Sequence, residues 1–104
     1  MATKETAIKE VNGFIALCRK NGLVFSKVIL FGSAARGTAD KYSDIDVMLF
    51  SDNFSENVIE NRGKLTPYIR DYYNLDIYAY PSYYFEKGSL LIDEVKKDGL
   101  ELTP

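Results

Sequence analysis

The 104-residue sequence contains no histidine and a single cysteine, Cys18. Without histidine the chain can form neither a histidine-ligated zinc site nor a Ser-His-Asp triad, and it has no histidine general base. One cysteine allows neither an intrachain disulfide nor a CxxC metal motif. Any catalytic or metal-binding chemistry must therefore rest on other side chains.

Basic runs and long apolar runs are also missing. The formal net charge is -2 and the sequence pI is about 5.1, with lysine and arginine spread along the chain. A protein that binds long nucleic acid normally shows a basic footprint, so we do not expect that class of partner. No apolar run approaches the roughly 20 residues of a membrane helix, and residues 1–14 do not resemble a signal peptide. We expect a cytoplasmic protein without membrane association.

The overall composition is that of a folded protein. Hydrophobic residues make up 46% of the chain and charged residues 27%, a balance typical of globular proteins. The length suits one domain with a core of modest size. We therefore expect a single domain over residues 1–104.

Hydrophobic periodicity predicts three strands among several helices. Apolar residues at helical spacing indicate a helix over 3–21, and short apolar runs indicate strands at 27–31, 44–50 and 74–80. Residues 34–42 should form a turn of helix and a loop. A helix is expected over 54–62, capped by Ser51, Asp52 or Asn53, and Gly63 should separate it from another at Thr66-Pro67. The last expected helix spans 89–98 and packs through Leu91, Ile92 and Val95.

Asp44 and Asp46 lie two positions apart in a predicted strand, so their carboxylates share one face. Like charges this close raise each other's pKa, which a cation between them would relieve. In the absence of histidine and thiolate ligands, oxygen donors favour Mg²⁺ or Mn²⁺. The alternative, which is common for an isolated Asp-x-Asp pair, is two solvated residues at a strand end.

Gly32-Ser33 follows the first predicted strand and favours the metal interpretation. A glycine at a strand end lets backbone N–H groups approach phosphate oxygens, and the serine hydroxyl adds a donor. Alone, Gly-Ser is more often an ordinary turn. Its position before Asp44 and Asp46, at the ends of successive strands, would bring phosphate to the carboxylates.

The stretch VILFGSAARGTADKYSDIDVMLF resembles the signature of the polymerase-beta-type nucleotidyltransferase superfamily. The short chain is most similar to the minimal nucleotidyltransferases of bacteria and archaea. This resemblance implies an α/β (α+β) fold with a small mixed sheet and helices mainly on one face. It assigns phosphate binding to Gly32, Ser33 and Arg36, and metal binding and catalysis to Asp44, Asp46 and Asp76.

Several neighbouring positions also bear on the proposed site. Asp76 shares the alternation of the first two aspartates, although a polar residue on an open sheet face is the alternative. Ala34 replaces the first arginine of the family's GSRARG form, and Thr38, Lys41 and Ser43 are more typical of solvated or capping residues. Aromatic and apolar residues on the predicted face of Asp76 would form a floor for base stacking or a protein partner; these are Met48, Phe50, Tyr78 and Tyr80.

The resemblance implies a Mg²⁺-dependent transfer of a nucleoside monophosphate, AMP from ATP, to an acceptor hydroxyl. In the minimal group the acceptor is frequently a tyrosine of a helical HEPN-type toxin, so the protein would act as an antitoxin; a homodimer is another possible assembly. A second hypothesis is an antitoxin or regulatory subunit that neutralises its partner by contact alone. A third, drug nucleotidylation, requires an acceptor-binding domain from a partner or second copy.

Overall fold

A four-stranded mixed sheet forms the centre of the computed structural model, which describes residues 4–37 and 44–104. The strand order is β3-β2-β1-β4. β1 (Lys27–Phe31) pairs antiparallel with β2 (Ile45–Ser51) and with β4 (Leu100–Leu102), whereas β2 runs parallel to β3 (Leu75–Pro81). The expected α/β class with a mixed sheet is confirmed. β1 has its predicted bounds, while β2 and β3 each begin and end one residue later than predicted.

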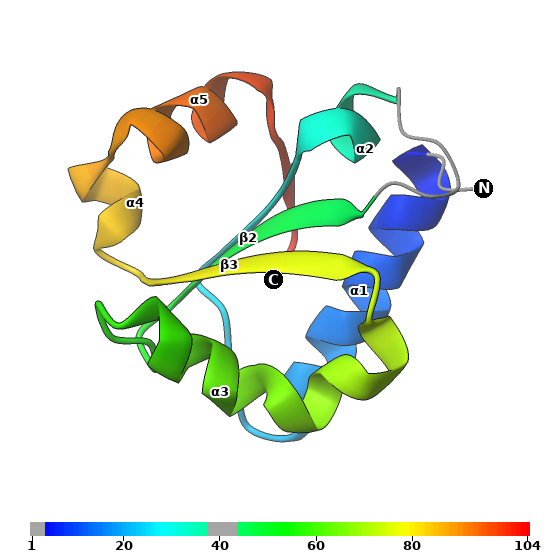
Figure 1. Ribbon diagram of the computed structural model, residues 1–104, viewed down its shortest axis with the longest axis vertical. Helices are drawn as coiled ribbons and strands as arrows, with labels where there is room; N and C mark the ends of the chain where they lie inside the picture. Colours follow the sequence, from blue (N-terminus) through cyan, green and yellow to red (C-terminus); the bar gives the residue numbers. More distant parts are fainter. Residues whose placement is uncertain (1–3, 38–43) are drawn as a thin grey trace.

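The two longest helices, α1 (Lys4–Lys20) and α3 (Val58–Ile69), cover one face of the sheet (Figure 1). This face carries the odd-numbered aliphatic residues of β2 and β3, because side chains alternate along a strand. The helical stripe predicted for α1 is buried against them. The buried members of the predicted stripe are Val11, Phe14, Ile15 and Cys18, whereas Ile8 and Leu17 are half-buried; Ala7, which was not predicted, is also buried.

Two short helices, α4 (Tyr84–Lys87) and α5 (Leu90–Asp98), cover part of the opposite face (Figure 1). Met48 and Phe50 are 0% exposed beneath them. The expectation that these two residues form an open floor beside the carboxylates is therefore wrong, because Ile92 and Val95 of α5 pack over that face. Leu91, predicted as a core contact, is 40% exposed.

α3 is one continuous helix where the sequence predicted two. Its N-cap is Asn57, whose side chain accepts hydrogen bonds from the N–H groups of Ile59 and Glu60, so the predicted cap at 51–53 is wrong. Gly63 and Pro67 lie within the helix. Asn61 and Leu65, on either side of Gly63, are both fully buried against the sheet. This packing outweighs the cost of about 1 kcal/mol for a helical glycine.

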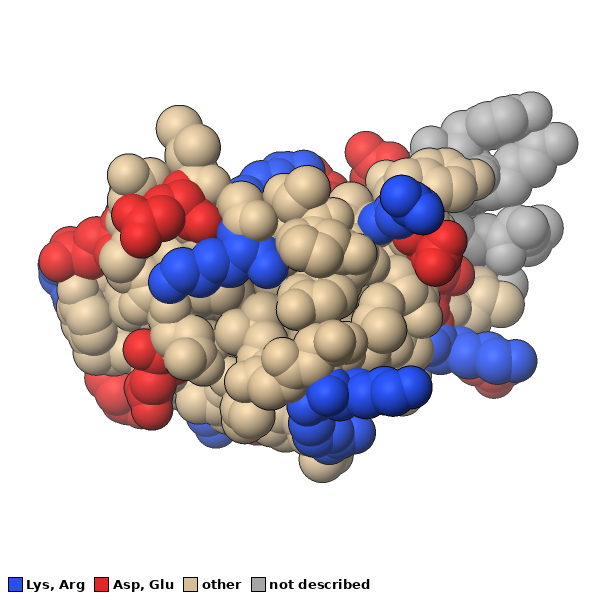
Figure 2. All heavy atoms as spheres, turned by 90° about the horizontal axis from the view of Figure 1, so that it is seen from below, with Lys and Arg blue, Asp and Glu red and all other residues tan. Residues whose placement is uncertain are grey.

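The remaining elements are short. A 3₁₀ turn, η1 (Arg70–Tyr72), leads from α3 to β3, and α2 (Gly32–Arg36) follows β1 directly. The predicted loop residues Thr38, Lys41 and Ser43 lie outside the described residues. None of the described helices has the length and apolar character required to span a membrane. On the face shown in Figure 2, acidic and basic side chains are interspersed around a central uncharged area.

Candidate active site

The strand register places Asp46 and Asp76 side by side. Asp46 of β2 is the direct partner of Asp76 in the parallel β2–β3 pair and of Phe31 in the antiparallel β1–β2 pair. Both carboxylates project from the face opposite the α1–α3 core, which confirms the alternation predicted for them. Asp44 is exposed and immediately precedes β2. The paired carboxylates thus lie at one end of the sheet, next to the end of β1.

Gly32 forms the turn from β1 into α2 and lies against the Asp46 carboxylate. Its φ of +73° is in the region that favours glycine. A Cβ atom built on Gly32 would also collide with Oδ2 of Asp46. The close approach therefore requires a residue without a side chain, and it brings the Gly32-Ser33 backbone to the carboxylates.

α2 carries the other residues assigned to phosphate. Ser33 is its second residue, and Arg36 is its last and exposed residue. The Arg36 charge acts on Asp46, where it opposes the rise in pKa described below. Ala34, which replaces an arginine of the family pattern, is 1% exposed within the α1–α3 core. At this position the chain therefore has a packing residue.

The electrostatics of Asp46 are those of a crowded carboxylate. Burial raises its pKa above 3.8, and the charges of Asp76 and Asp44, followed by a hydrogen bond with Asp76, raise it further. Arg36 acts in the opposite direction but does not offset these effects. A cation held between the carboxylates would relieve the repulsion.

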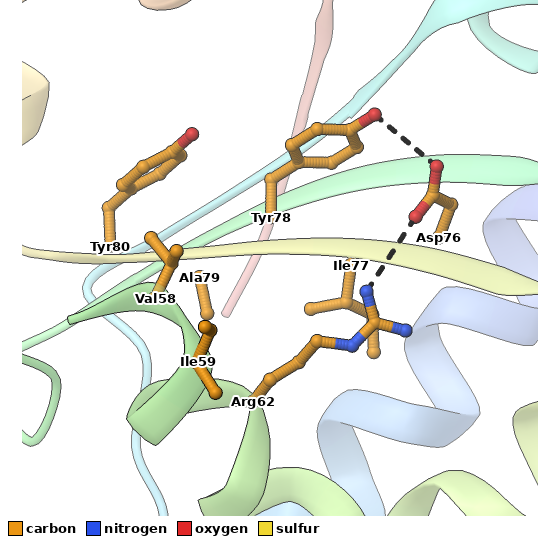
Figure 3. Close-up of a pocket in the computed structure, with 8 residues that line it drawn as sticks. All are labelled: Val58, Ile59, Arg62, Asp76, Ile77, Tyr78, Ala79 and Tyr80. Carbon is orange, nitrogen blue, oxygen red and sulfur yellow. Dashed lines mark hydrogen bonds and ion pairs between the residues drawn. The ribbon is translucent and has the colours of Figure 1, made fainter.

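Asp76 has partners that the sequence did not reveal. The Tyr78 hydroxyl donates to its Oδ2 over 3.3 Å, and Nη1 of Arg62 lies 4.0 Å from its Oδ1 (Figure 3). Burial and then the Asp76 charge raise the pKa of Tyr78, so its hydroxyl remains a donor at neutral pH. Arg62 comes from α3, far from Asp76 in sequence, and no local pattern could have indicated this contact.

The donor set fits a hard divalent cation. Within residues 4–37 and 44–104, no three His, Cys, Asp or Glu side chains are arranged as a ready metal cluster. The pair that does converge is Asp46 and Asp76, with Asp44 close enough to affect Asp46 electrostatically. Carboxylate oxygens suit Mg²⁺ or Mn²⁺, which commonly bind through one or two carboxylates together with substrate phosphates.

The fold is that of nucleotidyltransferases. A crystal structure described as a putative nucleotidyltransferase from Sulfolobus solfataricus superposes with a TM-score of 0.70 at 23% identity, covering 94% of this chain and 80% of that one. A chain in a crystal structure of a mutant of the toxin–antitoxin MntA-HpeT gives a TM-score of 0.58 at 23% identity. It covers 89% of this chain and 71% of that chain.

Sequence comparison identifies the family. The model of the nucleotidyltransferase domain family matches residues 14–102, and the chain belongs to this family. A Methanocaldococcus jannaschii protein named putative protein adenylyltransferase is 35% identical over 68 residues. The match covers 64% of this chain and 44% of the relative, so the chain spans less than half of that protein's length.

Proposed function

We propose that the protein transfers AMP from ATP to an acceptor hydroxyl in a reaction that depends on Mg²⁺ or Mn²⁺. The observation that carries this proposal is the pairing of Asp46 with Asp76 next to the Gly32-Ser33 turn. Such a site offers backbone donors for phosphate and oxygen ligands for a cation within one small region. Membership of the nucleotidyltransferase domain family supports the reaction class, and the name of the M. jannaschii relative supports AMP.

The proposed roles follow from position. Gly32, Ser33 and Arg36 bind the triphosphate, while Asp44, Asp46 and Asp76 hold the metal. The metal, when bound, neutralises phosphate charge and lowers the pKa of the acceptor hydroxyl. The acceptor oxygen forms a bond to the α-phosphorus, the bond from that phosphorus to the bridging oxygen breaks, and pyrophosphate leaves with the electron pair. Asp76 receives the acceptor proton.

For the acceptor, we propose a tyrosine on a partner protein, a HEPN-type toxin that the modification silences. The support is the family resemblance, the word "protein" in the relative's name, and a fold neighbour that belongs to a toxin–antitoxin structure. The second candidate is an antitoxin that acts by contact alone. The burial of Ala34 at a position that is arginine in the family pattern favours this candidate.

Label transfer separates the two candidates. The purified complex with a co-expressed partner is incubated with Mg²⁺ and α-labelled ATP, and the label on the partner is measured by autoradiography and peptide mass spectrometry. We expect labelling of a partner tyrosine, with loss of at least about 100-fold in the Asp44→Asn/Asp46→Asn double variant, as for removal of key transition-state groups.

As a control, circular dichroism checks that the double variant is folded. Copurification without any labelling would support the contact antitoxin. Full labelling by the folded double variant would contradict the assignment of the site.

A further inference from the structure

A pocket of about 320 Å³ runs along the free edge of β3, next to Asp76 (Figure 3). β3 is the end strand of the sheet, and no strand lies beyond it within residues 4–37 and 44–104. Val58, Ile59 and Arg62 of α3 form one side of the pocket. Tyr78 and Tyr80 project from the opposite side of β3 (Figure 3).

The edge of β3 offers little free backbone to the pocket. Ile45 N of β2 donates to Asn74 O, so the backbone N–H and C=O groups of the even-numbered residues of β3 point toward β2. Those of the odd-numbered residues point away from the sheet. Two residues of this outward set, Ile77 and Ala79, line the pocket. The Ala79 carbonyl already accepts a hydrogen bond from the Asn61 amide. Ile77 and Ala79 are only 4% and 2% exposed, because α3 packs along this edge, so an occupant would be recognised mainly through the side chains that line the pocket.

The geometry of an in-line displacement places the acceptor on this side. Attacking and leaving oxygens lie on opposite sides of the phosphorus. The Gly32-Ser33 turn lies at the end of β1, Asp46 is on the central strand β2, and Asp76 is on β3. If the triphosphate lies at β1, the acceptor hydroxyl approaches from the β3 side, where the pocket opens.

The residues that line the pocket indicate what kind of side chain it would bind. Val58 and Ile59 are 45% and 82% exposed and lie beside two half-buried tyrosines. Together these residues suit an apolar or aromatic side chain. Arg62 is the basic residue of the lining, and 55% of its side chain is exposed. Its 4.0 Å distance from Asp76 leaves the guanidinium able to pair with a second carboxylate.

We infer that this β3-edge pocket is the acceptor site, and that it binds a segment of a partner protein in which an acidic residue flanks the acceptor tyrosine. The acidic side chain pairs with Arg62, and the apolar side chains of the segment contact Val58 and Ile59. This inference rests on the proposed function, because it takes the tyrosine hydroxyl to be the acceptor at Asp76.

The test measures binding without ATP, so it does not depend on transfer. Two short fluorescein-labelled peptides, each with a central tyrosine flanked by either glutamates or lysines, are titrated with the protein and followed by anisotropy. We expect the glutamate peptide to bind about tenfold more tightly, a difference typical of one charge-assisted contact. Arg62→Glu should reverse the preference, Arg62→Gln should remove it, and the uncharged Ile59→Ser should weaken both peptides.

Arg70→Glu is the matched control, because it makes the same charge change on an exposed residue outside the pocket. Equal binding of both peptides to the wild type, or a preference unchanged in Arg62→Glu, would overturn the inference. So would a homodimer in sedimentation that Ile59→Ser dissociates, since the pocket would then belong to a second copy. An Arg62-dependent preference without any label transfer would support the docking site and contradict the proposed reaction.

Discussion

At the residue scale, Gly32 is under two constraints that substitution can separate. Its backbone has positive φ and its Cα faces the Asp46 carboxylate. Gly32→Ala should lower the free energy of unfolding by about 1–2 kcal/mol from the backbone conformation alone. It should also displace the carboxylate from the phosphate-binding turn and reduce label transfer by at least about tenfold. Urea unfolding and the transfer assay measure the two effects.

The matched control for this substitution is Gly22→Ala. Gly22 has φ of +86° but open space where a Cβ atom would lie. It should therefore lose similar stability and keep full transfer activity. Equal activity of the two variants would show that the contact between Gly32 and Asp46 is unimportant for catalysis.

Asp46 should make the protein less stable as the pH rises. Burial and the neighbouring carboxylates raise its pKa above 3.8 in the folded state. The folded state therefore binds this proton more tightly, and the free energy of unfolding falls as the pH increases through that raised pKa. The side-chain amide of the Asp46→Asn variant stays uncharged, so the variant should exceed the wild type in stability at neutral pH by up to about 1 kcal/mol.

Urea midpoints between acid and neutral pH, recorded in EDTA, measure this difference. Asp52→Asn, at an exposed residue outside the site, serves as the control. A constant difference between the Asp46 variant and the wild type at all pH values would contradict the electrostatic explanation.

At the element scale, Asn61 fixes the position of α3 against the sheet edge. Its buried amide donates to the carbonyls of Ser55 and Ala79 and accepts from Ser55 N. Asn61→Ala would leave these backbone groups without partners, and we expect a loss of about 2–4 kcal/mol. Thermal and urea unfolding check this value, with the cap variant Asn57→Ala expected to lose only about 1 kcal/mol. A similar loss for both would mean that Asn61 contributes only locally to α3.

The strands were predictable from the sequence because each is a local pattern. The bounds of β1, and the alternation that brings Asp46 and Asp76 to one face, follow from periodicity alone. The continuity of α3 does not, because Gly63 and Pro67 are local break signals that the burial of Asn61 and Leu65 overrides. α4 and β4 were missed because they are short and depend on neighbours distant in sequence. Arg62 was missed for the same reason.

At the scale of the whole molecule, the site lies at one end of the sheet face that α4 and α5 partly cover. On this face α4 and α5 cover Met48 and Phe50. Asp46 and Asp76 lie beyond them, where the face is only half-buried. A carboxylate pair whose mutual repulsion is unrelieved destabilises the folded state. Ligands that bind only the folded chain should therefore be visible as a gain in global stability.

Mg²⁺ should raise the unfolding temperature through this linkage. At a concentration about tenfold above its Kd, the gain is about 1.4 kcal/mol, or several degrees for a domain of this size. Differential scanning fluorimetry in EDTA, in Mg²⁺, and in Mg²⁺ with ATP measures it, with NaCl at equal ionic strength as the control for screening. The Asp44→Asn/Asp46→Asn variant should gain no stability from Mg²⁺ beyond that given by NaCl at equal ionic strength, because it lacks the charges that attract the ion. If Mg²⁺ stabilises that variant as much as the wild type, the ion binds elsewhere and the carboxylates do not form the metal site.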